Sequence, residues 1–294
     1  AGHSGYPFRL FYRSSAGDVA IYHASNRVGI SQRPAEPCTM GTFFSNRHSG
    51  MQIPNGKPVV IQSLARDILD ACTPAADAAV NGAEHDLDTL ARAFEQLVDV
   101  LVRATADTRA GGSSDAAECT EIGSYGLQLH AQLAATAGKL GLAGQRDALA
   151  RLAVNLALWV AAHDGRIDSL EAVVDALAVL ANTTREPARL EDLSDVFSRI
   201  IAAVPEVISQ DLEKSNPGRP WRVLLLNQSI VATRSHNTDR MEAAFALLTA
   251  KLPEDAARFF TEGMQQMDAL DYPAQVRAVM EKYHRRWTVN RSLH

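Results

Sequence analysis

Residues 86–107 read DLDTLARAFEQLVDVLVRATAD, and this stretch decides the fold that we expect for the chain. Its large apolar residues recur at intervals of three and four, which gathers them on one face of an α-helix. The helix is expected to end before Gly111-Gly112-Ser113-Ser114, a flexible joint. Such an amphipathic helix buries its apolar face against other helices. That face carries Leu87, Leu90, Phe94, Leu97, Val98 and Leu101.

The same helical period continues on both sides of this stretch, from about residue 61 to residue 287. Because the joints between the expected helices are only a few residues long, neighbouring helices are expected to pack antiparallel. We therefore predict an all-α protein of about ten helices, with antiparallel helix pairs packed as an irregular α-solenoid or a layered helical bundle. The expected helices cover about residues 59–71, 86–107, 116–140, 143–163, 168–182, 187–204 and 223–231, and three shorter ones start near Thr238, Pro253 and Pro273.

Helix starts near residues 116 and 167, and partner starts near residues 143 and 188, repeat at about 45–50 residues. That period is typical of helix-pair repeats of the solenoid kind. The Trp, Gly, Tyr, Ala and Pro pattern of tetratricopeptide repeats is absent, and the two units share no motif. The sequence therefore predicts a helical repeat without identifying a family.

The best-marked joint lies between the fourth and fifth expected helices. Gly165 is expected to adopt the left-handed conformation that closes a helix, and Asp168 with Glu171 forms a D-x-x-E capping box for the next helix. The joint also resembles the second half of an EF-hand calcium loop. Val160 and Ala162 stand where that loop needs oxygen ligands, so we predict no metal site here.

The chain divides into three predicted parts. Residues 1–58 form an irregular N-terminal arm, rich in Gly, Ser, Arg and Pro, with a short strand near residues 19–22. Residues 59–214 form the body of helix pairs. Because residues 215–220 are the strongest helix breaker, a C-terminal helical subdomain packed on the body is expected at residues 215–294. We expect a poorly packed arm, and the alternatives are a targeting segment or an extension from outside the functional domain.

Composition limits the class of protein. Hydrophobic residues make up 46% of the chain and charged residues 21%, as in globular rather than disordered chains. The longest apolar stretch, residues 152–162, falls well short of the roughly eighteen residues that a membrane span requires. Cys38, Cys72 and Cys119 lie far apart with no CxxC, which fits a reducing compartment and gives no zinc site. We expect a cytoplasmic protein, or an organellar one if the arm is a transit segment.

Charge is distributed unevenly along the chain. Residues 1–50 carry five arginines and two acids, a balance of +3, and residues 277–294 carry five bases and one acid, a balance of +4. Because the net charge of the whole chain is −5, the residues between these ends hold −12. An acidic body argues against a nucleic-acid groove, as does the low aromatic content of 6%.

The motifs of the common catalytic and nucleotide-binding sites are absent from the sequence. No G-x-S-x-G elbow follows a predicted strand, and the histidines lie in different helices with no recognisable partner order. Neither GxGxxG nor GxxxxGK[ST] occurs, so the usual phosphate cradle is missing. We therefore predict no catalytic residue and no cofactor.

One segment concentrates a large aromatic residue and cations on this acidic body. Arg and Trp are the residues most enriched at binding hot spots, so we predict a partner-binding surface here. In the alternative interpretation, the tryptophan fills the core and the arginines pair with neighbouring acids. The predicted partner-binding residues are Arg219, Trp221, Arg222, Arg234 and His236. A second basic and aromatic cluster covers residues 282–287, where cations also stabilise a helix C-terminus.

These observations favour a non-enzymatic helical scaffold or adaptor that binds another protein. Helix-pair layers expose long faces and grooves suited to partner helices or peptides. The alternative is an enzymatic or small-molecule-binding helical domain whose polar residues converge only in three dimensions. A closed pocket lined by convergent His, Asp and Arg would favour the alternative, whereas an open apolar or acidic groove would favour the scaffold.

Overall fold

The computed structural model describes residues 11–13, 19–21, 53–77, 83–110, 115–212 and 214–288. Eleven α-helices, one short 3-10 helix and two short strands lie within these ranges, so the predicted all-α class is confirmed. The first elements are β1 (Phe11–Arg13), β2 (Val19–Ile21), α1 (Pro58–Asp77), α2 (Ala83–Arg109), α3 (Ala116–Lys139), η1 (Ala143–Gln145), α4 (Arg146–Ala162) and α5 (Glu171–Thr183). The remaining helices are α6 (Pro187–Ala202), α7 (Glu206–Ser209), α8 (Pro220–Arg234), α9 (Thr238–Lys251), α10 (Pro253–Ala269) and α11 (Ala274–Thr288).

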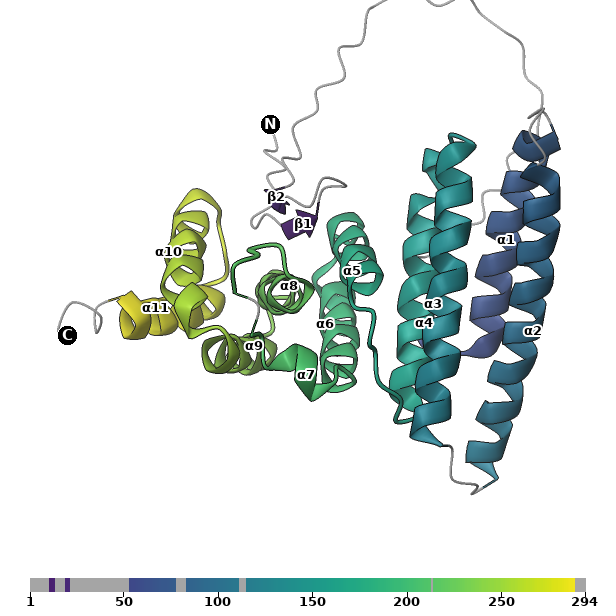
Figure 1. Cartoon of the computed structure of the whole chain (residues 1–294). Coiled ribbons are helices and arrows are strands. Elements are labelled where there is room, and N and C mark those ends of the chain that lie inside the picture. The colour runs from purple at the N-terminus through teal and green to yellow at the C-terminus, as the bar shows by residue number, and fades with distance from the viewer. Residues whose placement is uncertain are drawn as a thin grey trace, which may run out of the picture.

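Four long helices, α1 to α4, stand side by side at one end of the molecule (Figure 1). Helix α1 packs against α2 and α4, and α3 packs against α2 and α4. The apolar face predicted for residues 86–107 is buried in α2, where Leu101 is fully covered and Leu90 is 6% exposed. The period of that stretch therefore identified both the helix and the side it buries.

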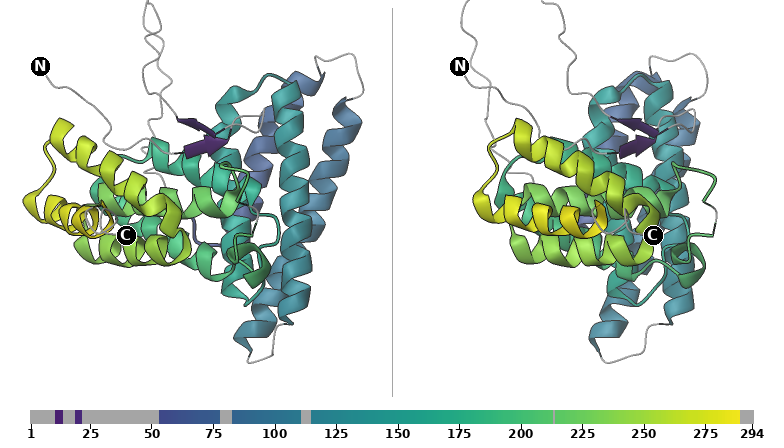
Figure 2. Two further views of the ribbon diagram at one scale, coloured as in Figure 1. Left: turned by 60° about the vertical axis from the view of Figure 1, so that its left-hand side comes forward. Right: turned by 90° about the vertical axis from the view of Figure 1, so that its left-hand side faces the viewer.

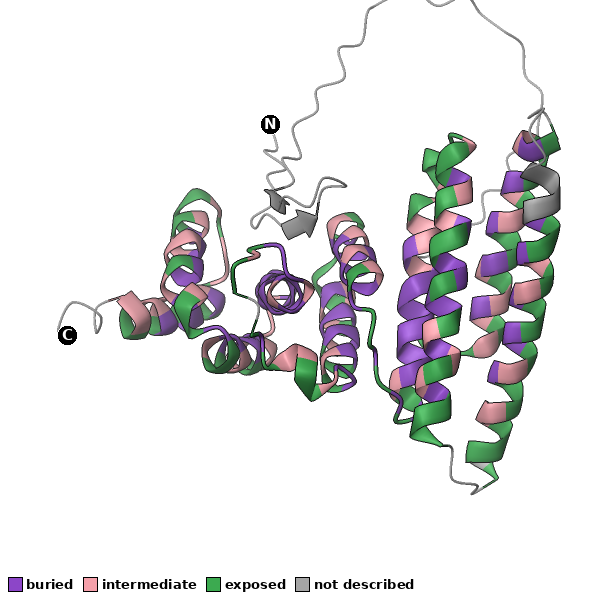
Figure 3. Ribbon diagram, in the orientation of Figure 1, coloured by how far each residue is buried: buried purple, intermediate pink, exposed green. Residues whose placement is uncertain are grey.

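The second half of the chain continues the packing away from these helices. Helix α4 packs against α5 and α6, and these two contact α8. Helix α8 is buried nearly all round, as Figure 3 shows, because other helices surround it. Helices α9, α10 and α11 close the far end of the molecule (Figure 2). Their core is an aromatic cluster in which the Phe245 ring lies 5.1 Å from Phe260 and 5.2 Å from Tyr283, centroid to centroid.

The two short strands pair antiparallel, with Phe11 opposite Ile21. The predicted strand near residues 19–22 corresponds to β2. Strand β1 contacts α5 and α8, so one piece of the N-terminal arm rests on the helical body.

Helix α1 does not end where the sequence predicted. The expected range of residues 59–71 is too short, because the helix continues through Pro74 to Asp77. A proline inside a helix costs roughly 3 kcal/mol through a lost hydrogen bond and a steric clash. Cys72 and Ala76 on either side of it are buried, and packing against α2 outweighs that local cost.

The joint between α4 and α5 closes differently from the predicted pattern. Asp164, not Gly165, has the left-handed conformation, with a φ of 58°. The Gly165 N–H donates to the Val160 carbonyl at 3.0 Å, which closes the helix end. A Cβ at Gly165 would lie 2.8 Å from Cγ1 of Val160, so close packing explains this glycine. The predicted capping box is wrong as well, because α5 begins at Glu171 with Leu170 at its N-cap and no side-chain cap bond there.

A short segment before α1 is fixed on α4. Oδ1 of Asn155 accepts hydrogen bonds from the backbone N–H groups of Asn55 and Gly56, each at 3.0 Å. Gly56 has a φ of 76°, and a Cβ there would lie 2.8 Å from backbone atoms of Leu158 and Trp159. Only glycine fits this position, because both the conformation and the space exclude a side chain.

Removing residues 1–50 is expected to leave the helical body folded. A chain that starts at Met51 keeps the anchor on Asn155 and all eleven helices, and loses the strand contact with α5 and α8. Thermal melting followed by circular dichroism measures the difference from the full chain. A loss of several kcal/mol would show that large apolar side chains of the arm dock into the core, since burying one such side chain stabilises by about 1.5–3 kcal/mol.

Candidate functional site

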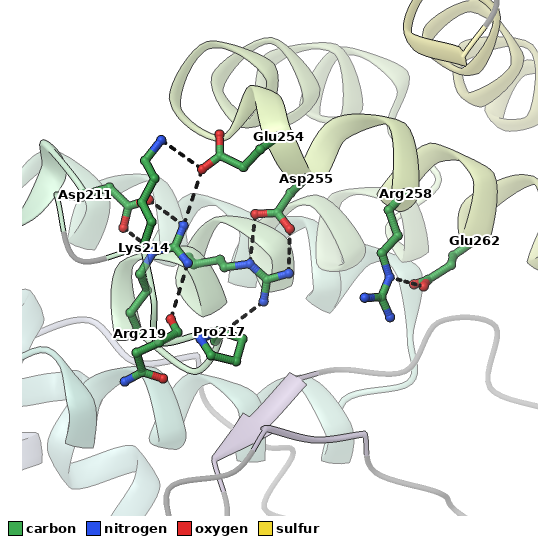
Figure 4. A network of polar contacts seen from close by, with 10 residues as sticks. Asp211, Lys214, Pro217, Arg219, Glu254, Asp255, Arg258 and Glu262 are labelled. Atoms are coloured by element: carbon green, nitrogen blue, oxygen red, sulfur yellow. Dashed lines mark hydrogen bonds and ion pairs between the residues drawn. The ribbon is translucent and has the colours of Figure 1, made fainter. Parts of the chain in front are cut away.

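The predicted partner-binding residues lie around helix α8, mostly inside the protein. Trp221 sits in the first turn of α8 with 3% of its surface exposed. Arg219 is also buried, and its Nε and Nη2 donate to the two carboxylate oxygens of Asp211 at 2.5 and 2.7 Å. Figure 4 shows this pair beside Glu254, whose carboxylate lies 3.5 Å from Arg219. A buried, doubly bonded guanidinium of this kind holds the segment before α8 in place.

Arg222 joins the start of α8 to the start of α10. Its Nε and Nη2 donate to the carboxylate of Asp255 at 2.8 and 2.5 Å, and Nη1 donates to the Pro217 carbonyl. The side chains of Arg222 and Asp255 are each 12% exposed. Both members of the pair are therefore occupied inside the protein.

Arg234 closes the end of a neighbouring helix. It is 5% exposed, and its guanidinium donates to the carbonyls of Ala181 and Thr184 at 2.8 Å each, where α5 ends. His236 follows α8 in the left-handed conformation, with its ring edge-on to Tyr272 at 5.6 Å. Burial lowers the pKa of His236.

These positions favour the alternative interpretation, in which the tryptophan fills the core and the arginines pair with internal groups. The predicted hot-spot surface would need exposed side chains, and Trp221, Arg219 and Arg234 are buried. Partner binding through these residues stays a prediction that only a binding measurement can test. The pairing acids Asp211 and Asp255 lie 8 and 33 residues away from their arginines in the sequence, which a local pattern cannot reveal.

The basic cluster at residues 282–287 is partly neutralised by internal contacts. Lys282 Nζ donates to the carboxylate of Glu242 at 2.7 Å, and the Tyr283 hydroxyl donates to the same carboxylate at 2.9 Å. Burial and this carboxylate raise the pKa of Tyr283 to about 12. Arg285 pairs with Glu281 one turn earlier. The cluster therefore serves as an anchor between α9 and α11.

A large hollow, lined entirely by described residues, lies between α3 and α5, with α4 as its floor. It has a volume of about 610 Å³ and is open to solvent on one side. Seven alanines and two glycines dominate its lining, and we call it the alanine groove. The lining residues are His130, Ala131, Ala134, Ala137, Gly138, Gly141, Leu142, Ala143, Arg146, Leu149, Ala150, Ala172, Asp175, Ala176 and Val179.

The alanine groove exists because small side chains face each other across α4. Helices α3 and α5 both pack against α4, and their alanines are too short to close the space between them. Along α3, the lining residues Ala131, Ala134 and Gly138 follow helical spacing on one side of the helix. This stripe of small residues is the feature of the sequence that could have indicated the groove. Large apolar residues, by contrast, indicate the core.

His130 places a neutral imidazole in the wall of the alanine groove. Its Nε2 lies 3.0 Å from the Leu149 carbonyl, an acceptor, so Nε2 carries the proton and donates. Among the described residues, its Nδ1 finds no hydrogen-bond partner. Burial lowers the pKa of His130, which keeps the ring neutral at neutral pH. The groove thus contains one weakly polar group among apolar ones, with Arg146 and Asp175 as charged lining residues.

A second groove runs between α2 and α3. Two neighbouring hollows, of about 340 and 360 Å³, share the lining residues Val100 and Ile122, and we describe them together as one groove. Four of its lining residues are acids, and we call it the acidic groove. The lining residues are Gln96, Leu97, Val100, Arg103, Ala104, Asp107, Asp115, Glu118, Cys119, Glu121, Ile122 and Tyr125.

Comparison with known proteins leaves the geometry as the only guide to function. No family model, no curated protein and no solved structure matches the chain. In the described ranges, no helix is long and apolar enough to cross a membrane. Nor do three His, Cys, Asp or Glu side chains gather there in a way that could hold a metal ion. The two grooves are therefore the features from which a function can be argued.

Proposed function

We propose that the protein is a non-enzymatic helical scaffold that binds another protein, and that the alanine groove receives the apolar face of a partner helix. The observation that carries the proposal is an open and mostly apolar hollow of about 610 Å³ on a rigid helical frame. Amphipathic helices bind such grooves through large side chains one turn apart. Small lining residues help, because they let the backbone of a second helix approach closely.

The length of the alanine groove suits a short helical segment. Its α3 wall runs from His130 to Gly138, which at 1.5 Å per residue is about 12 Å, or roughly two helical turns. Arg146 and Asp175 bring one positive and one negative group to the lining. A partner helix with two or three large aliphatic side chains on one face would fill the hollow, and its flanking charges would set its direction.

A matched pair of variants on α3 tests the proposal. Ala131 and Ala135 are both exposed alanines on this helix, and only Ala131 lines the alanine groove. Ala131→Arg is expected to reduce recovery of a stoichiometric partner by about tenfold, because a cation would occupy the apolar hollow, a change of about 1.4 kcal/mol. The measurement is affinity purification from the native cell with quantitative mass spectrometry.

The control, Ala135→Arg, is expected to recover the partner as the unaltered chain does. Both variants should melt normally, since exposed substitutions change stability by about 0.5 kcal/mol or less. Equal recovery with both variants would remove the groove from the proposal. Absence of any stoichiometric partner from the unaltered chain would refute the scaffold function itself.

A small-molecule site is the second candidate function, and the character of the alanine groove supports it. Ligand sites usually have about 300–1,000 Å³ and are apolar with a few polar groups, which here are His130, Arg146 and Asp175. Native mass spectrometry of the protein from its own cell distinguishes the candidates. A bound compound of low mass, released on denaturation and lost in Ala131→Arg, would favour the second function over the first.

A further inference from the structure

We infer that the acidic groove between α2 and α3 is a separate docking site, which binds a basic amphipathic helix of another protein. It lies along the first half of α3, from Asp115 to Tyr125, whereas the alanine groove uses the second half, from His130 to Gly138. The inference does not depend on what the alanine groove binds.

One half of the acidic groove is apolar. Leu97 and Val100 of α2 face Ile122 and Tyr125 of α3 across a hollow of about 360 Å³. Tyr125 is 45% exposed, which is unusual for a large aromatic side chain on a helix of the bundle. An apolar strip open to solvent is a feature of surfaces that a partner covers.

The other half concentrates carboxylates. Asp107 and Glu118 in this half, and Glu121 at the edge of the apolar half, form no ion pair with any described residue. Asp115 uses its carboxylate to cap α3. Arg103 is the single base in the lining, and its Nε donates to the Asp99 carbonyl. A lining with four acids and one base repels anions and attracts cations.

The position of Asp107 supports a binding role over a structural one. This residue lies in the last turn of α2, where the negative end of the helix dipole disfavours a carboxylate. Glu118, in the first turn of α3, has the opposite and favourable placement. Helix stability therefore explains why position 118 carries an acid, and does not explain the acid at position 107. A basic partner would bind both Asp107 and Glu118.

The occupant follows from these two halves. Leucine-like side chains would enter the apolar half, and lysines or arginines on the same helix would face the carboxylates. A single small cation would satisfy the acids and leave the apolar strip exposed. A helix with an apolar face and a basic face satisfies both.

Binding of two synthetic peptides tests the inference. The first is a peptide of about 18 residues, which is long enough to form a helix, with leucine on one face and lysine on the other. The second is its twin with glutamate in place of lysine. Fluorescence anisotropy of the labelled peptides against the full chain is expected to show at least about tenfold tighter binding of the lysine peptide, and this preference should shrink as salt is added.

Variants locate the binding site. Asp107→Lys is expected to weaken binding of the lysine peptide about tenfold, and the exposed control Asp192→Lys on α6, with the same change in net charge, should have little effect. Equal binding of the two peptides, or equal loss in the two lysine variants, would overturn the inference. So would loss of binding in Ala131→Arg with none in Asp107→Lys, because the peptide would then occupy the alanine groove.

Discussion

Replacing Trp221 by alanine is expected to lower the free energy of unfolding by about 3–5 kcal/mol, the usual cost of deleting a buried tryptophan. The side chain is 3% exposed and stands at the start of α8, the helix that the others surround. Its loss would leave a cavity at the buried start of α8, which the surrounding helices cannot close fully. Urea unfolding at equilibrium, with circular dichroism as the readout, measures the change.

Trp287 supplies a matched control for this measurement. It is only half-buried, near the end of α11, and packs against the rim of the core. Trp287→Ala is therefore expected to cost clearly less than Trp221→Ala, since less apolar surface returns to water. If Trp221→Ala leaves stability within about 0.5 kcal/mol of the unaltered chain, the tryptophan is an exposed anchor and the predicted partner surface is restored.

The helices themselves could be predicted from the sequence, because burial of an amphipathic face is a local and periodic signal. The stretch 86–107 is the clearest example, and the helix expected at residues 223–231 lies within α8. Errors came at helix ends. Packing against α2 overrode the local preference of Pro74, and α5 begins at Glu171, two residues later than a cap at Asp168 would place it. Tertiary contacts decide such ends, and a local pattern does not contain them.

The candidate sites were harder to predict, for a different reason. A groove depends on the space left between helices, and alanines such as Ala134 and Ala176 create that space by being small. The excess of acids in the middle of the chain was visible in the sequence. The sequence did not show that these acids converge on one groove, because Asp107 and Glu118 belong to two different helices, α2 and α3.

Replacing Asn155 by leucine is expected to lower the free energy of unfolding by about 2–4 kcal/mol. Asn155 is 1% exposed, and its Oδ1 accepts both N–H groups that fix the segment before α1. Leucine offers no acceptor, and each buried N–H left without one costs about 1–3 kcal/mol. The expected loss lies in the lower part of the sum of these two costs, because the Asn55 N–H is only partly buried and water can reach it. Asn182→Leu, a half-buried position on α5, is the control and is expected to change stability by about 0.5 kcal/mol or less.

A double variant decides whether Asn155 acts through the docked segment. Gly56→Ala should destabilise the protein by itself, since the added Cβ would meet backbone atoms of α4 at 2.8 Å and the φ of 76° disfavours a side chain. If both substitutions release the same segment, the second one has little left to disrupt. The double variant should then lose clearly less stability than the sum of the two single losses, a coupling that urea unfolding of all three variants measures. Additive losses would mean that Asn155 stabilises the protein independently of the segment at residues 53–57, and would contradict the anchor role.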